Sequence, residues 1–176
     1  MTAQGGSADI GVVFRTDNNG SNASAVHSFT KTNSGARPMY NQLSEYNGKF
    51  YAMTSAGGGN DLGVIFEWDP ATNIYTKKYD FELANGINPH GNLALMNNKF
   101  YGMTLFGGAN DQGVIFEWDP VSNAYTKKYD FNAANGTKPY GGLVFNAGKF
   151  YGMTNSGGSN GKGVIFQWDP VTNVRF

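Results

Sequence analysis

The chain has 176 residues, including 25 glycines and no cysteine, and 15% of its residues are aromatic. Its 13 basic residues balance 13 acidic ones, so it lacks the positive excess that would neutralise a phosphate backbone, and nucleic acid is not an expected partner. The absence of cysteine excludes a disulfide framework and a thiolate zinc site. No stretch approaches the roughly 20 consecutive apolar residues of a membrane-spanning helix, so the chain is not expected to be transmembrane.

A sequence repeat dominates the chain from its first residues. Residues 1–10 read as a partial repeat, because MTAQGG at 1–6 aligns with MTNSGG at 153–158. Three copies follow at 11–62, 63–112 and 113–162, and 163–176 begins a fourth. The first copy is two residues longer, and we expect the extra length in its stretch DNNGSNASAVHSF. A unit of this length that recurs at a fixed period predicts a repeat architecture.

Each copy contains four short runs rich in aromatic and β-branched residues, which predict β-strands. In the second copy these runs are 64–69, 75–81, 92–96 and 99–104. The segment Asp69-Pro70-Ala71-Thr72-Asn73 has the residues of a hairpin turn, and Asn47-Gly48 predicts a second kind of tight hairpin. The chain is therefore predicted to be all-β without helices, and four antiparallel strands per unit correspond to one propeller blade.

The repeat resembles known families. The strand KFYGMT, the Gly-Gly pair after it and the run VIFEWDPATNIY resemble kelch propeller repeats, and the pattern Tyr-Gly-x-Thr, Gly-Gly, Gly-x-Val-Phe is closer still to the bacterial GloVer tandem repeat. The kelch resemblance implies four-stranded antiparallel blades of a β-propeller, with 92–96 innermost and 75–81 outermost. It also implies two whole blades flanked by two partial ones, so residues 1–176 are expected to be a single array from a larger propeller.

The candidate chemistry is sparse. Trp68, Trp118 and Trp168 recur at equal spacing, and an exposed row of such rings would stack sugars. The alternation of Val64, Phe66 and Trp68 on one face of a strand instead favours packing between blades.

Polar residues in the loops give no stronger site. Asn60-Asp61 and Asn110-Asp111 offer oxygens to calcium, but the third copy has Asn160-Gly161, which favours a turn role; no metal or cofactor is predicted. The two histidines, His27 and His90, occupy non-equivalent places in the repeat, with no nucleophile at a diagnostic spacing. We therefore predict no catalytic residue, and the place of His90 beside Pro89, where another copy has Tyr140, favours a structural role for that histidine.

The function expected from these features is a non-enzymatic scaffold for binding or adhesion that contacts a protein or glycan through its blade loops. The GloVer resemblance implies a secreted bacterial protein or one at the outer cell surface, and hence a substrate of export or surface-anchoring machinery. Two alternatives stay open. One is a carbohydrate-active or oxidase-like enzyme whose active site lies outside this segment, and the other is an intracellular kelch-type adaptor.

Overall fold

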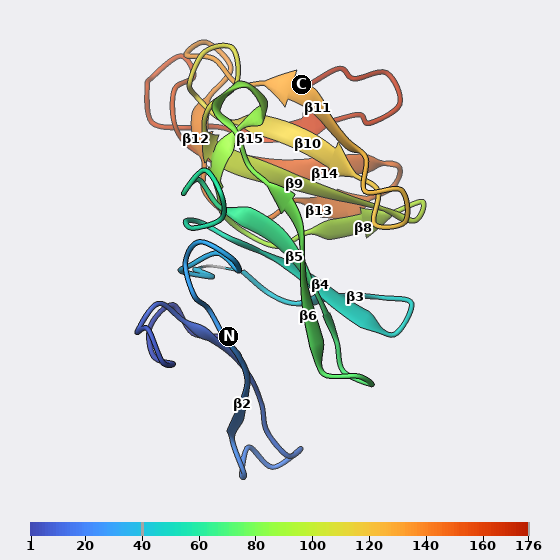
Figure 1. Cartoon of the computed structure of the whole chain (residues 1–176). Coiled ribbons are helices and arrows are strands. Elements are labelled where there is room, and N and C mark those ends of the chain that lie inside the picture. The colour runs from blue at the N-terminus through green and yellow to red at the C-terminus, as the bar shows by residue number, and fades with distance from the viewer. Residues whose placement is uncertain (40, 176) are drawn as a thin grey trace.

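The structure is a computed structural model that describes residues 1–39 and 41–175. These residues form 15 strands and one 3₁₀ turn, in a series of small sheets that follow one another along the chain (Figure 1). In chain order the elements are β1 (Val12–Arg15), β2 (Ser24–Ser28), β3 (Ser44–Tyr46), β4 (Lys49–Thr54), β5 (Val64–Asp69), β6 (Ile74–Asp80), the 3₁₀ turn η1 (Leu83–Asn85), β7 (Ile87–Pro89), β8 (Ala94–Met96), β9 (Lys99–Phe106), β10 (Val114–Trp118), β11 (Tyr125–Asp130), β12 (Thr137–Pro139), β13 (Val144–Asn146), β14 (Lys149–Ser156) and β15 (Ile165–Trp168).

The main sheets have the predicted blade topology. Strands β3-β4-β5-β6 form one antiparallel sheet in that order, which we call blade A, and β8-β9-β10-β11 form blade B. Strands β13, β14 and β15 form blade C, and β1 pairs with β2 in an N-terminal hairpin. The all-β prediction is confirmed. Each blade combines the last two strands of one repeat with the first two of the next.

Two short strands were not predicted. Strand β7 pairs with the end of β9 through Ile87 and Phe106, and β12 pairs with β14 in the same way. Both lie in the segment that leads from the last strand of one blade to the first strand of the next. These three-residue strands carry too little alternation for a periodicity argument to detect them.

The expected position of the two extra residues in the first copy is wrong. Residues 12 and 28 are paired in the N-terminal hairpin just as residues 64 and 80 are in blade A, so the separation across the hairpin is the same. One extra residue is Thr30, because the bridge between Lys31 and Gly35 corresponds to that between Glu82 and Gly86. The other lies between Pro38 and the start of β3, in a stretch that includes Tyr40, which lies outside the described residues.

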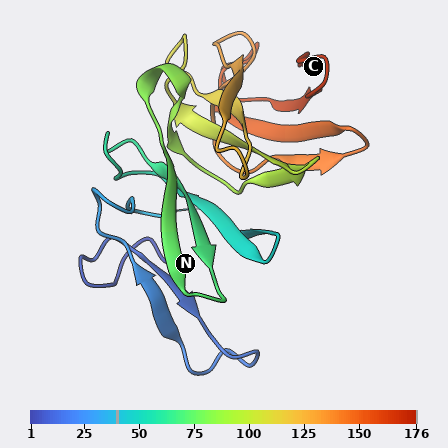
Figure 2. The same ribbon diagram turned by 45° about the vertical axis from the view of Figure 1, so that its right-hand side comes forward.

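Each blade has two distinct faces. We call the side toward the following blade its forward face and the opposite side its rear face. On blade A the forward face carries Tyr51, Met53 and Ile65, which join one buried cluster with Phe116 and Trp118 of blade B. The same pairing recurs between blades B and C, and the stacking of successive sheets is visible in Figures 1 and 2. The core is thus made between blades and not within them.

A repeated bulge lets the last strand of a blade contribute side chains to both faces. In blade A, Ile65 pairs with Tyr79 but Phe66 pairs with Lys77, so one residue of β6 is left out of register. The shift recurs in blade B and in the N-terminal hairpin. As a result Tyr75 packs with Phe66 on the rear face of blade A, while Tyr79 packs with Ile65 on the forward face. On a regular strand these two tyrosines, which are four residues apart, would lie on the same face.

Candidate functional site: the rim loops

One edge of the blades carries a row of equivalent loops. Each blade contributes the glycine-rich loop after its second strand, and the loop that follows the last strand of the preceding sheet packs against it. We call these three pairs the rim loops: residues 30–35 with 57–61, 82–86 with 107–111, and 132–136 with 157–161. One backbone hydrogen bond joins each pair: Gly58 N to Lys31 O at 2.7 Å, Gly108 N to Leu83 O at 2.8 Å and Gly158 N to Ala133 O at 2.9 Å.

Side-chain oxygens hold the backbone of these loops in place. In the first pair, Asp61 Oδ1 accepts the amide of Gly57 at 3.0 Å, and the Asn60 amide donates to the carbonyl of Phe81 at 3.0 Å. Asp80 Oδ1 accepts the amide of Gly59 at 2.7 Å. The second pair repeats all three bonds through Asp111, Asn110 and Asp130. The carboxylates of Asp61 and Asp111 therefore bond to their own loops, and the described residues contain no group of three or more His, Cys, Asp or Glu side chains that could hold a metal ion.

The exposed chemistry of the rim loops differs from one pair to the next. The first pair carries an ion pair between Lys31 and Asp61 at 3.0 Å, with both side chains more than half exposed. The second presents Leu83, which is 58% exposed. The third presents the small exposed side chains of Ala133 and Ala134. The three loop pairs therefore share a backbone contact but present different exposed side chains.

The three tryptophans lie at the opposite ends of the strands from the rim loops. Trp118 and Trp168 are fully buried and Trp68 is 7% exposed. Each indole stacks on a phenylalanine of the adjacent strand, at centroid distances of 5.7, 6.0 and 5.7 Å in blades A, B and C. Trp118 also lies 5.7 Å from Tyr51 of blade A. Trp168 likewise lies 5.9 Å from Tyr101 of blade B, so Trp118 and Trp168 pack between blades, whereas Trp68 stacks on Phe50 of its own blade.

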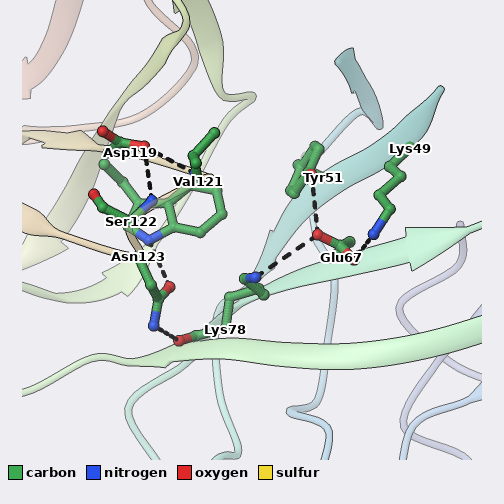
Figure 3. Close-up of polar contacts among 9 residues, drawn as sticks. Lys49, Tyr51, Glu67, Lys78, Asp119, Val121, Ser122 and Asn123 are labelled. Carbon is green, nitrogen blue, oxygen red and sulfur yellow. Dashed lines mark hydrogen bonds and ion pairs between the residues drawn. The ribbon is translucent and has the colours of Figure 1, made fainter. Parts of the chain in front are cut away.

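Glu67 on β5 has a buried carboxylate that the sequence analysis did not single out (Figure 3). Glu67 is 8% exposed; its carboxylate accepts hydrogen bonds from Lys49 Nζ at 2.6 Å and from the Tyr51 hydroxyl at 2.9 Å. Lys78 Nζ lies 3.8 Å from the same carboxylate. Burial opposes ionisation of Glu67, but these donors outweigh it and hold its pKa below the ordinary value. Blade B repeats the network around Glu117.

A further polar contact joins blades A and B directly. The side-chain amide of Asn123, in the Asp-Pro turn of blade B, donates to the backbone carbonyl of Lys78 in blade A at 2.8 Å (Figure 3). Its oxygen accepts the indole N–H of Trp118 at 3.0 Å. Asp119 Oδ1 holds the same turn by accepting two backbone amides, those of Val121 and Ser122. These polar groups serve the contact between blades.

Both histidines pack against aromatic rings. His90 is 5% exposed, and its ring meets that of Tyr140 edge-on at 4.7 Å. His27 stacks on Tyr75 at 3.8 Å with an interplanar angle of 8°. Burial lowers the pKa of each ring. Both histidines therefore lie in packing positions.

The fold and the rim loops together define a propeller-like array of repeated antiparallel blades. The chain belongs to the Gloeobacter/Verrucomicrobia repeat family, whose sequence profile matches residues 1–175, and this confirms the GloVer resemblance. No helix in the described part of the chain is long and apolar enough to span a bilayer.

Solved structures support the fold. The crystal structure of TolB from Acinetobacter baumannii is similar with a TM-score of 0.56 at 13% sequence identity. The similarity covers 93% of this chain but only 36% of the TolB chain, so the present chain spans about a third of that structure. At this identity the likeness concerns the fold alone. The comparison with curated proteins found no match.

Proposed function

We propose that this chain is a non-enzymatic binding scaffold whose rim loops contact a protein or glycan partner. The observation that carries the proposal is the contrast within the rim: in all three loop pairs a glycine amide donates to a carbonyl of the facing loop, whereas the exposed side chains change from an ion pair to leucine to alanine. Side chains needed only for folding would be expected to repeat with the fold. Exposed variation on a constant frame is typical of recognition.

The finer features of the proposal come from family resemblance. We propose kelch-like blades within a propeller, in a bacterial protein that is secreted or displayed on the outer cell surface, where it would serve adhesion. Its export would require secretion or surface-anchoring machinery. Fractionation of the native bacterium with an antibody against this chain tests the location, and detection in the cytoplasm alone would contradict it and favour an intracellular adaptor.

Binding through the rim is tested with matched surface variants. The chain is screened on a glycan array and against extracted bacterial surface proteins, and the hits are measured again with Lys31→Ala and Leu83→Ser. Val121→Ser is the control, because Val121 is 79% exposed but lies in an Asp-Pro turn at the other end of the strands. We expect one or both rim variants to weaken binding about tenfold or more, with the control unchanged.

Two results would refute the proposal. One is binding that depends on Val121 and not on the rim. The other is a partner that is recovered chemically altered, since a scaffold binds without turnover, and this would favour the alternative of a carbohydrate-active or oxidase-like enzyme.

A further inference from the structure

A hollow of about 290 Å³ opens beside the first pair of rim loops. Its lining comes from these loops and from the segments that border them: Ile10, Lys31, Ala36, Arg37, Ala56 and Asp61. The amide of Arg37 donates to the carbonyl of Ile10 at 2.9 Å. Between blades A and B the equivalent bond joins Asn88 and Leu62 at 3.0 Å. The hollow therefore lies at a junction between two consecutive sheets and not on an end face of the array.

Two small side chains distinguish this junction from the next one. Ala36 and Ala56, which both line the hollow, pair in a short antiparallel bridge. In blade B the equivalent pair is Ile87 and Phe106. The backbone pairing is shared, so the two junctions differ in the size of the side chains that they hold. A volume of about 290 Å³ lies near the lower end of the range for small-molecule sites, which suits one sugar ring.

The hollow offers a cation that has no partner of its own. Arg37 is exposed, and its guanidinium makes no hydrogen bond or ion pair within the part of the chain that the structure describes. A guanidinium binds a carboxylate through two parallel hydrogen bonds. With Lys31 and Asp61, the charged groups of the lining sum to one positive charge, which a single carboxylate neutralises.

The hollow also offers an acceptor for hydroxyl groups. The Lys31 side chain and the Gly57 amide, with a smaller contribution from the charge of Arg37, hold the pKa of Asp61 below its ordinary value. Asp61 is therefore ionised at neutral pH and only accepts hydrogen bonds. A uronic acid supplies both a carboxylate and hydroxyl donors, whereas an acidic side chain supplies the carboxylate alone. None of the described lining residues is aromatic, so a neutral sugar has no ring to stack on.

We propose that this hollow binds one acidic sugar residue of a glycan, with the sugar carboxylate on Arg37 and sugar hydroxyls donating to Asp61. The inference rests on the proposed binding role of the rim, and it names the ligand class of the first loop pair. The other two junctions have different residues at the places of Lys31, Arg37 and Asp61: Glu82, Asn88 and Asp111, then Asn132, Lys138 and Gly161. Among the described junctions, only the first has a cation and a carboxylate together at these places.

The test is an NMR titration of the intact chain with the methyl glycosides of glucuronic and galacturonic acid, with methyl glucoside and methyl galactoside as neutral counterparts. At least one acid is expected to bind with a Kd of about 1 mM, the strength expected for one small sugar. Arg37→Asn is expected to weaken this binding about tenfold or more, and Arg37→Lys to weaken it less. Asparagine tolerates the backbone, since Asn88 has a φ of 51° where Arg37 has 54°. Lys138→Asn is the matched control, because it removes the same charge at the equivalent place of another junction.

A second variant tests the room in the hollow. Ala36→Ile combined with Ala56→Phe installs the pair that blade B carries. This variant is expected to weaken binding of the acidic sugar about tenfold or more, with its fold checked by circular dichroism. Retained binding in the folded double variant would place the ligand elsewhere and would overturn the proposal. If the double variant does not fold, the Arg37 variants still decide the outcome.

Four other results would overturn the proposal: no binding of either acid, equal binding of the neutral sugars, unchanged binding in Arg37→Asn, or an equal loss in Lys138→Asn. Tighter binding of N-acetylglutamic acid amide, which has a carboxylate and no hydroxyl, would overturn it as well and would favour an acidic protein partner. Failure here is distinguishable from failure of the proposed function. A partner whose binding still depends on Leu83 would show that the rim binds even if the hollow takes no acidic sugar.

Discussion

Packing between blades can be measured with equivalent residues of the same chain. Ile115 and Ile165 occupy the same place on β10 and β15, but Ile115 is fully buried under blade C and Ile165 is 80% exposed. Replacement by alanine removes three carbon atoms, worth about 0.8 kcal/mol each when buried. With the cavity term, Ile115→Ala is expected to lower the free energy of unfolding by about 3 kcal/mol. Ile165→Ala is expected to lower it by about 0.5 kcal/mol or less.

The assay is urea unfolding followed by tryptophan fluorescence. In a thermal scan, 3 kcal/mol corresponds to a loss of about 6 to 12 °C in Tm for a chain of this size, against about 2 °C or less for Ile165→Ala. Equal losses for the two variants would refute the reasoning, because they would show that stability comes from each sheet alone and not from the contact between sheets.

Two further substitutions test the polar contacts beside the tryptophans. The folded-state pKa of Glu67 lies below its ordinary value of 4.5, so the stability that its carboxylate contributes is present above pH 4.5 and is lost as the pH falls through the folded-state pKa. In urea unfolding from pH 7 to 3, Glu67→Gln is therefore expected to lose less unfolding free energy in acid than the parent chain. An equal loss in the two chains would contradict this expectation. Asn123→Ala removes the hydrogen-bond donor to the Lys78 carbonyl. Asn73 also accepts a tryptophan N–H, at 3.3 Å, but within the described residues it has no hydrogen bond to another blade. Asn123→Ala is therefore expected to lower the free energy of unfolding by about 1 kcal/mol more than Asn73→Ala does. Equal unfolding free energies for these two variants would show that the contact between blades contributes little.

The strands and their order could be predicted because their signals are local. Aromatic and β-branched runs, Asp-Pro turns and Asn-Gly hairpins each act within a few residues, and the repeat allows one copy to confirm another. The same locality explains why packing was favoured for Trp68, Trp118 and Trp168. Alternation along one strand shows which side chains share a face, and a face with valine, phenylalanine and tryptophan is usually covered.

Features that depend on the partner strand could not be predicted. The bulge opposite Ile65 and Phe66 has no recognisable residue pattern in the sequence, yet because of it Tyr75 and Tyr79 face different sheets. The Glu67 network was missed for the same reason, since Lys49 is 18 positions away in sequence and meets the carboxylate only once β4 and β5 pair. The glutamate recurs as Glu117, and this repetition on an otherwise apolar strand was the available signal.

His27 provides the last prediction, because it stands where the other copies have tyrosine. It stacks on Tyr75 at 3.8 Å, as Tyr79 stacks on Tyr125 at 4.3 Å. Burial lowers its pKa from the ordinary value of 6.5, and its Nε2 atom is buried without a hydrogen-bond partner. Because the folded-state pKa of His27 lies below 6.5, the stability contributed by its buried neutral ring is fully present above pH 6.5 and is lost as the pH falls through the folded-state pKa.

The N-terminal hairpin is therefore expected to loosen from blade A in mild acid before the blades separate. Hydrogen exchange of the amides of β1 and β2, measured from pH 7.5 to 5 and corrected for intrinsic rates, is expected to show falling protection in the parent chain and nearly constant protection in His27→Tyr, which restores the ring of the other copies. His90→Tyr is the control, since it removes the other buried histidine and leaves this hairpin unchanged. Proton NMR gives the independent check: a His27 ring that titrates at or above pH 6.5 would show that docking does not disfavour its charged form, and the expected acid sensitivity would then have no physical basis.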